Sequence, residues 1–519
     1  PSTVRRPCPS RRDAACQRSA TPVASRSGAR GAPRRGPGPT AAGQPARALP
    51  ALGSAPAPLA RRPGGDLVGR RRAYVVGLLA YGAGAVAMTL AQSLVAVVIF
   101  WSVIGGLGAA LLLPAMQSLV HGNFEGTARK AAYALVGAAA AIAAAGGPLL
   151  GGVIPTTLAW RVAVGLEAVV IVVVLVGVRL VRDVPYTGDR AVDVVGTVLS
   201  VVGMGGVVLG VLVWQEGGEA VGALVLVGAL GLAGLAWWLV RRARAGRTTL
   251  VDPGLFRSPA FRIGVSQQLL QQVALGGAMI ALPIFLQMAL GYDALLAGLS
   301  LAPLSLTMFA AALVAGKRPG RRRPASRVLA GFLLLVVGVV ALVAVVPRAS
   351  SGWWLALPLV VAGAGLGLLV SQLNAYTLSP VPEERASEAA GVSSAAGSFG
   401  LSLGLAVAGA VMLASLAAGF TARAEASDVL PPDDKEQVAR VLEDDAEIMS
   451  DAQLVELLAD EPPAVRAEVV AINDDVRARA LQVALLVPLV AGLLGVVAAL
   501  RMRRLPDPEV REGEPPVLG

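Results

Sequence analysis

Long apolar runs are the feature that most constrains this chain. They recur from Ala73 onward and mostly hold about 20 residues, which is the length that a helix needs to cross about 30 Å of hydrocarbon. Since the bilayer core offers no water to backbone N–H and C=O groups, each run must be an α-helix. We predict twelve such segments, at 73–91, 95–119, 131–153, 161–180, 194–214, 219–240, 263–289, 294–316, 327–346, 353–378, 389–417 and 480–500.

The composition agrees with a membrane protein. The chain is 55% hydrophobic and 15% charged, with a mean hydropathy of +0.66, whereas soluble chains hold about 25% charged residues. Aromatic residues are few, and the 61 glycines allow helices to pack backbone to backbone. The sequence therefore predicts an all-α polytopic membrane protein rather than a soluble protein with buried helices.

The net charge of +11 would suggest nucleic acid in a soluble protein. Here the basic residues lie in alternate loops, at Arg70–Arg72, Arg129–Lys130, Arg179/Arg182/Arg190, Arg241–Arg247, Lys317–Arg327, Glu383–Arg385 and Arg501–Arg504. The positive-inside rule places these loops in the cytoplasm. We therefore predict a multi-pass protein of the cell (inner or plasma) membrane with a cytoplasmic C-terminus and no nucleic-acid partner.

The two ends of the apolar region differ from it. Residues 1–63 are rich in Arg, Pro, Ser and Ala without a hydrophobic period, so they cannot fold alone. A disordered segment, a transit peptide and a mis-called start or frameshift are the alternatives, and we favour the last. Residues 421–479 are acidic and lie on the outer side, where we expect a solvated cap of helices.

Two short motifs resemble those of a transporter family. Asp66, Gly69, Arg70 and Arg71 match the pattern G-x-x-x-D-x-x-G-R-R between helices 2 and 3 of the major facilitator superfamily. An arginine there can pair with the carboxylate and with helix-end carbonyl groups at the membrane face. The resemblance implies that this turn gates the cytoplasmic side.

The second motif narrows the resemblance to exporters. Gly147, Pro148, Gly151 and Gly152 match G-P-x-x-G-G in helix 5 of the drug:H⁺ antiporters of this superfamily. Proline bends a helix, and glycine allows close helix contact. A generic glycine-rich packing face is the alternative.

Further stretches resemble the fourteen-helix branch, the EmrB/QacA-like multidrug exporters. They are Gly105–Leu119, Leu250–Phe261 and Ala389–Gly409, and the resemblance covers Gly65 to about Arg504. The twelve segments would then be family helices 3–14. The implied division is a remaining N-terminal bundle (64–193), two linker helices (194–247), a C-terminal bundle (248–417), an acidic loop (418–479), a last membrane helix (480–504) and a cytoplasmic tail (505–519).

The chain departs from the family at its usual proton-coupling groups. Helix 4 of the family carries R-x-x-Q-G, but Ser102, Gly105 and Gly106 occupy the corresponding positions. The acidic residue of family helix 1 is absent with its helix. We therefore look for proton-carrying groups elsewhere in the apolar runs.

Other polar groups in the apolar runs are the remaining candidates. Glu167 stands alone in its segment, and burial favours the neutral form of a carboxyl group, which suits a proton carrier. Gln268, Gln271 and Gln272, with Gln267, have spacings that place several amides on one helix face. They can line a polar cavity or join helices by hydrogen bonds.

We predict a secondary transporter that exports drugs or other hydrophobic or cationic small molecules in exchange for protons. A same-fold transporter of one metabolite and a truncated, non-transporting membrane protein are the alternatives. We expect no enzyme activity, cofactor or metal, since the chain has one histidine, two cysteines and no P-loop. The expected partners are the lipid bilayer, a small-molecule substrate and protons, and the expected state is a monomer.

Overall fold

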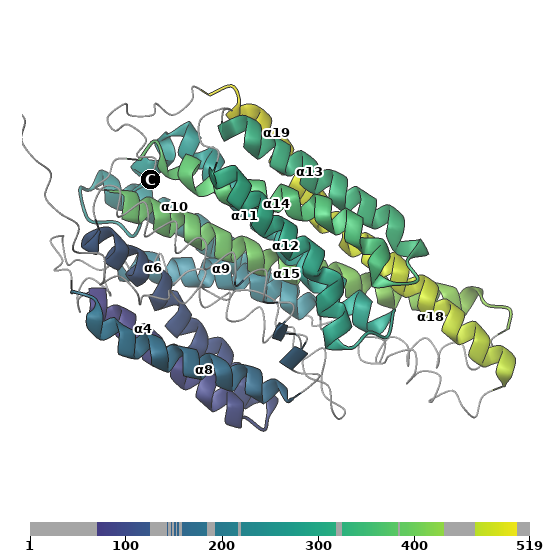
Figure 1. Ribbon diagram of the computed structural model, residues 1–519. Helices are drawn as coiled ribbons and strands as arrows, with labels where there is room; N and C mark the ends of the chain where they lie inside the picture. The colour runs from purple at the N-terminus through teal and green to yellow at the C-terminus, as the bar shows by residue number, and fades with distance from the viewer. Residues whose placement is uncertain are drawn as a thin grey trace, which may run out of the picture.

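The structure is a computed structural model, shown in Figure 1. It describes residues 70–124, 143, 147, 150–151, 153–154, 158–183, 193–215, 220–317, 324–381, 385–429 and 462–505. The longer helices of these residues are α4 (Arg70–Leu90), α6 (Gly106–Asn123), α8 (Trp160–Gly177), α9 (Val194–Gln215), α10 (Val221–Arg244), α11 (Pro259–Met288), α12 (Ala294–Lys317), α13 (Pro324–Val345), α14 (Ala356–Leu378), α15 (Ala386–Ala426), α18 (Pro463–Ala484) and α19 (Leu486–Met502).

Short helices join some of these elements. They are α5 (Leu94–Val97), the π-helix η1 (Val98–Gly105), and the 3₁₀ helices η2 (Val178–Leu180), η3 (Pro253–Arg257), η4 (Val346–Arg348) and η5 (Gly352–Leu355). In the described part of the chain, 11 helical stretches are long and apolar enough to cross a membrane. They coincide with eleven of the twelve predicted segments, which confirms the all-α membrane fold. The remaining segment, 131–153, lies almost wholly outside the described residues.

The helices alternate in direction between two ends of the molecule. Arg327, at the start of α13, donates a hydrogen bond to the Ala315 carbonyl near the end of α12 (3.4 Å). At the opposite end, the Gly352 N–H donates to the Tyr292 hydroxyl (2.9 Å). We call the first end, where the clustered arginines lie, the arginine-rich end. The loops on either side of these helices therefore lie at alternate ends of the molecule, as the sequence predicted.

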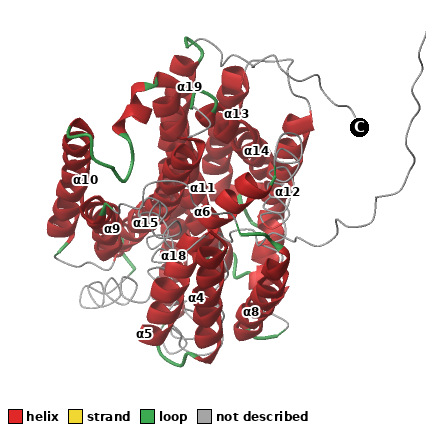
Figure 2. Cartoon of the chain, turned by 90° about the vertical axis from the view of Figure 1, so that its left-hand side faces the viewer, coloured by secondary structure: helices red, strands yellow, loops and turns green. Residues whose placement is uncertain are grey.

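The helices form two groups with a pair beside one of them. Helices α4, α6 and α8 with η1 lie together, in the lower part of Figure 1. Helices α11–α15, α18 and α19 form the second group, which we call the C-terminal bundle. The pair α9–α10 packs against α15 and stands at the side of the molecule in Figure 2.

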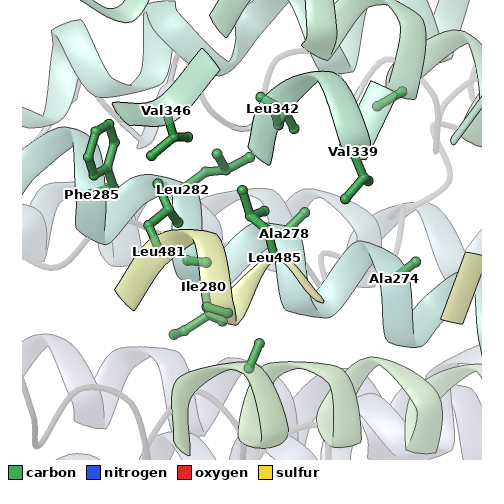
Figure 3. Close-up of a cluster of buried hydrophobic side chains, with 14 of the residues drawn as sticks. Ala274, Ala278, Ile280, Leu282, Phe285, Val339, Leu342, Val346, Leu481 and Leu485 are labelled. Atoms are coloured by element: carbon green, nitrogen blue, oxygen red, sulfur yellow. The ribbon is translucent and has the colours of Figure 1, made fainter. Parts of the chain in front are cut away.

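The core of the C-terminal bundle is apolar and closely packed. Figure 3 shows side chains from α11, α13, η4 and α18 meeting there, among them Leu282, Leu342, Val346 and Leu481. Leu282 is fully buried. Since lipid tails are as apolar as leucine, such helices associate through close packing rather than through exclusion of water.

Glycines allow two helix pairs to approach at backbone distance. A methyl group on Gly206 of α9 would lie 2.8 Å from the Cα atom of Gly228 on α10. A methyl group on Gly404 of α15 would overlap the carbonyl oxygen of Val273 on α11. Only glycine fits at these crossings, so the many small residues in the apolar runs position whole helices.

Helices α15 and α18 continue past the membrane limits predicted for them. Helix α15 has 41 residues and ends at Ala426, and α18 begins at Pro463, within the predicted acidic loop. Arg423 and Asp475 form an ion pair between them (2.5 Å). The region 463–479 is thus helical, and α18 projects from the molecule at the right of Figure 1. The segments 1–63 and 430–461 lie outside the described residues.

Candidate functional site

Glu167 is the one polar residue in a stripe of buried residues on α8. Val164, Glu167 and Ile171 are the buried residues of this helix, while Val169 and Val173 are exposed on its outer side. The spacing of three and four residues places the stripe against α4. Glu167 is 5% exposed, so the structure places the predicted carboxyl group inside the group of helices rather than toward lipid.

Tyr81 of α4 is a partner of this carboxyl group. Its hydroxyl group donates a hydrogen bond to Oε1 of Glu167 at 2.6 Å. The Tyr81 ring lies beside Trp101 of η1, with 5.8 Å between ring centroids. A phenol can donate to a carboxylate and can also accept from a carboxylic acid. The pair can therefore hold either protonation state of Glu167 without leaving the carboxyl group unpaired.

The neighbouring helix is irregular where the family's arginine would stand. Ser102 is buried within η1, and Gly105 and Gly106 mark its junction with α6. A methyl group on Gly84 of α4 would lie 2.6 Å from the carbonyl oxygen of Phe100, so α4 is pressed against this irregular turn. Single turns of π-helix often accompany functional sites. The crossing beside Tyr81 is thus tight, and Ser102, Gly105 and Gly106 bring no charge to it.

The gating motif is described only from its arginines onward. Asp66 and Gly69 lie outside the described residues, and Arg70 and Arg71 form the first turn of α4. The backbone N–H of Arg71 donates to Oδ1 of Asp183 at 3.1 Å. An acidic residue at a helix N-terminus is favourable because it meets unpaired N–H groups and the positive end of the helix dipole. Asp183, which follows η2, is a contact of this turn that the sequence did not suggest.

The segment before Asp183 also holds α6. The side-chain amide of Asn123, the last residue of α6, donates to the Arg182 carbonyl at 3.2 Å. At the other end of α8, Arg161 donates to the Ala91 carbonyl after α4 (3.1 Å) and lies over the ring of Trp160. Residues on both sides of α8 therefore fix its position against α4 and α6.

The antiporter motif is described at two of its four positions. Gly147 and Gly151 have helical backbone, and Pro148 and Gly152 lie outside the described residues. A methyl group on Gly147 would meet no atom within 4 Å. The role of this motif in bending the helix stays a prediction.

The glutamines of α11 divide between two surroundings. Gln267 and Gln271 are 0% and 1% exposed, and neither amide atom of Gln267 nor the Oε1 atom of Gln271 has a hydrogen-bond partner in the described structure. Gln268 and Gln272 are half-buried and face α15, where a methyl group on Gly397 would lie 3.5 Å from the Nε2 atom of Gln268. The sequence grouped these residues correctly on one helix, but it did not show that Gln267 is the most buried of them.

The two sets of candidates belong to different groups of helices. Glu167 and Tyr81 lie between α8 and α4, whereas the glutamines lie on α11 in the C-terminal bundle. Helix α8 packs against α4, whereas α11 packs against α14, α15 and α19. The candidates therefore form two separate polar sites rather than one.

The chain is similar to one protein family and to several individual proteins. The sequence profile described as Major Facilitator Superfamily matches residues 42–405. The chain is 30% identical over 389 residues to the multidrug resistance protein Stp of Mycobacterium tuberculosis, covering 73% of this chain and 70% of that protein. It is also 30% identical over 368 residues to the puromycin resistance protein pur8 of Streptomyces alboniger, covering 68% of this chain and 71% of that protein.

A third relative is matched over a smaller share of its length. The chain is 27% identical over 368 residues to a probable actinorhodin transporter of Streptomyces coelicolor, which covers 69% of this chain and 64% of that protein. The match therefore spans less than two thirds of that relative.

Solved structures share the fold at low sequence identity. The POT family transporter PepTSo is 12% identical with a TM-score of 0.57, and the match covers 90% of each chain. A bacterial homologue of the human lysosomal transporter Spinster is 14% identical with a TM-score of 0.55, covering 89% of this chain and 92% of that one. At these identities the likeness shows the fold alone.

Proposed function

The chain belongs to the major facilitator superfamily, and on that premise we propose that it exports drug-like small molecules from the cell. The observation that supports this best is the likeness to proteins named for multidrug resistance and for puromycin resistance, each over about 70% of this chain. Transporters of this fold move one helix bundle against another around a site near the bilayer midplane. The proposed substrates are hydrophobic or cationic.

We propose protons as the coupling ion, with Glu167 as the group that carries them. The carboxyl group is buried in an apolar helix and has the Tyr81 hydroxyl at 2.6 Å. An ionisable group inside a membrane helix is costly and is most often functional. Since Ser102 replaces the family's arginine, this pair is the best remaining candidate for coupling.

The glutamines of α11 are the proposed polar contacts for substrate. Gln268, Gln271 and Gln272 offer neutral donors and acceptors to a ligand, and Gln271 has an amide oxygen without a partner. A buried amide without a partner is unfavourable in an apolar surrounding. A state of the transporter in which this face of α11 opens to a ligand would satisfy it.

The two sequence motifs have proposed roles in the conformational change. Asp66, Arg70 and Arg71 would close the cytoplasmic side, with Gly69 allowing the turn. The glycines and the proline at 147–152 would let their helix bend. The arginine-rich end would face the cytoplasm with the C-terminus, and the chain would act as a monomer in the cell membrane.

Transport into vesicles tests the proposal. The full chain is reconstituted in liposomes, a pH gradient is imposed, and the movement of a fluorescent hydrophobic cation is followed. We expect uptake or release that depends on the gradient and is absent from empty liposomes. Movement of the dye that is insensitive to the gradient would contradict proton coupling, and no movement of any of several such cations would contradict drug export.

A matched pair of variants tests Glu167 itself. Glu167→Gln keeps the shape of the side chain and its acceptor for Tyr81 but cannot carry a proton, so gradient-driven transport should be lost. Asp293→Asn changes an exposed carboxyl group at the opposite end from the arginines and should transport like the parent. If Glu167→Gln also transports like the parent under the gradient, protons take another path.

A further inference from the structure

Three residues before η3 form a strap between two parts of the molecule. We call Leu250–Asp252 the strap. The Leu250 N–H donates to Oδ2 of Asp193 at 3.1 Å, and the Asp252 N–H donates to Oε1 of Glu388 at 2.6 Å. The side chains of Leu250 and Val251 are buried. Two carboxyl groups from distant parts of the sequence thus bind neighbouring backbone groups.

Asp193 joins the strap to the α9–α10 pair. It is 2% exposed, and its Oδ1 atom accepts from the Gly196 N–H in the first turn of α9 (3.0 Å) and from the Trp238 indole of α10 (2.9 Å). The guanidinium group of Arg242 lies 3.8 Å from the same oxygen. A buried carboxylate is costly unless its hydrogen bonds are satisfied, and this one is satisfied from three elements at once.

Glu388 joins the strap to α15. It is buried in the first turn of α15, and Arg385, just before this helix, forms an ion pair with the Asp252 carboxylate at 2.6 Å. Apolar contacts follow the same path inside the membrane. Val208 of α9 and Ala406 of α15 belong to one buried cluster.

We propose that Asp193 and Glu388 are positioning residues that hold the α9–α10 pair to the C-terminal bundle, so that the two move as one body. The pair stands between the two groups of helices in the sequence, so it could in principle move with either or with neither. The polar contacts at the arginine-rich end and the apolar contacts with α15 both assign it to the C-terminal bundle. This assignment needs no assumption about substrate or coupling ion.

Distances between spin labels test the proposal in the full chain. With Cys8 and Cys16 changed to Ser, labels are placed at Leu230→Cys of α10 and Val337→Cys of α13, which are 63% and 56% exposed. In lipid nanodiscs we expect one narrow distance distribution. In the double variant Asp193→Ala/Glu388→Ala the distribution should become at least about twice as wide, because loss of the hydrogen bonds frees the strap.

Four variants separate positioning from a general loss of structure. Glu388→Gln keeps an acceptor for the Asp252 N–H, so its distance distribution should be as narrow as that of the parent. Glu388→Ala removes the acceptor, so its distribution should be wider. Arg385→Gln removes only a partly exposed ion pair and should widen the distribution less than Glu388→Ala. Asp293→Ala removes a carboxyl group that binds the Leu296 N–H at the other end (2.7 Å) and should leave the width unchanged.

Two results would overturn the proposal. One is a distance distribution of the parent protein with two separated populations, which would mean that the α9–α10 pair moves relative to the C-terminal bundle. The other is a double variant as narrow as the parent. The measurement needs no substrate, so it gives an answer even if the chain exports none of the compounds tested.

Discussion

At the scale of single residues, the interaction that matters most joins positions far apart in the sequence. Tyr81 and Glu167 are 86 residues apart and meet because α4 and α8 pack together. The sequence singled out Glu167 because a carboxyl group is rare in an apolar helix, but one tyrosine among apolar residues carries no such signal. Asp193 was missed for a related reason, since an acidic residue before a helix resembles any charged loop residue.

Replacement of the phenol tests the residue pair directly. Tyr81→Phe keeps the ring beside Trp101 but removes the hydroxyl group from Glu167. A hydrogen bond to a charged group contributes about 1.5 kcal/mol or more, so we expect gradient-driven transport to fall by about tenfold. The measurement is the initial rate of dye movement in liposomes.

The matched control is Tyr292→Phe, which also removes a phenol hydroxyl that takes part in a hydrogen bond. Tyr292 lies in the C-terminal bundle, at the end opposite the arginine-rich end, and Tyr292→Phe should transport like the parent. Equal effects of the two substitutions would show that Tyr81 serves stability alone.

At the scale of helices, the sequence predicted which segments are helical better than it predicted their bounds and irregular turns. Eleven predicted segments match helices because length and hydropathy suffice where the backbone has no other partner. The π-helix η1 has no such signal, because its residues are as apolar as those of an α-helix in the membrane. The extension of α18 to Pro463 was hidden by acidic residues, which lower the hydropathy of a helix outside the bilayer.

Two neighbouring glycines of α9 provide a test of helix packing. Gly206→Leu would force a side chain against Gly228 of α10, whereas a methyl group on Gly205 meets nothing within 4 Å. We expect Gly206→Leu to destabilise the protein by about 1–3 kcal/mol, as overpacking does, and Gly205→Leu to have little effect. Thermal unfolding of the purified variants in detergent measures both, and equal midpoints would contradict the packing described.

At the scale of the whole molecule, the alternation of charged loops predicts the orientation in the membrane. Arg247 is exposed at the arginine-rich end and Ser350 at the other. In a chain without Cys8 and Cys16, an impermeant maleimide should label Ser350→Cys in intact cells and Arg247→Cys only after the cells are opened. The reverse labelling pattern would show that the protein has the opposite orientation in the membrane, with its C-terminus outside the cell.

Because α15 is long, a small tilt of this helix would move its far end by a large distance. Its 41 residues make a rod about 60 Å long, roughly twice the thickness of the hydrocarbon layer. A tilt of about 10° around its arginine-rich end would carry the far tip through about 10 Å, because displacement grows with distance from the pivot. Ser427 hydrogen-bonds Glu468 of α18 at that tip. A small rotation of α15 within the membrane would therefore displace this contact, outside the membrane, by a much larger distance.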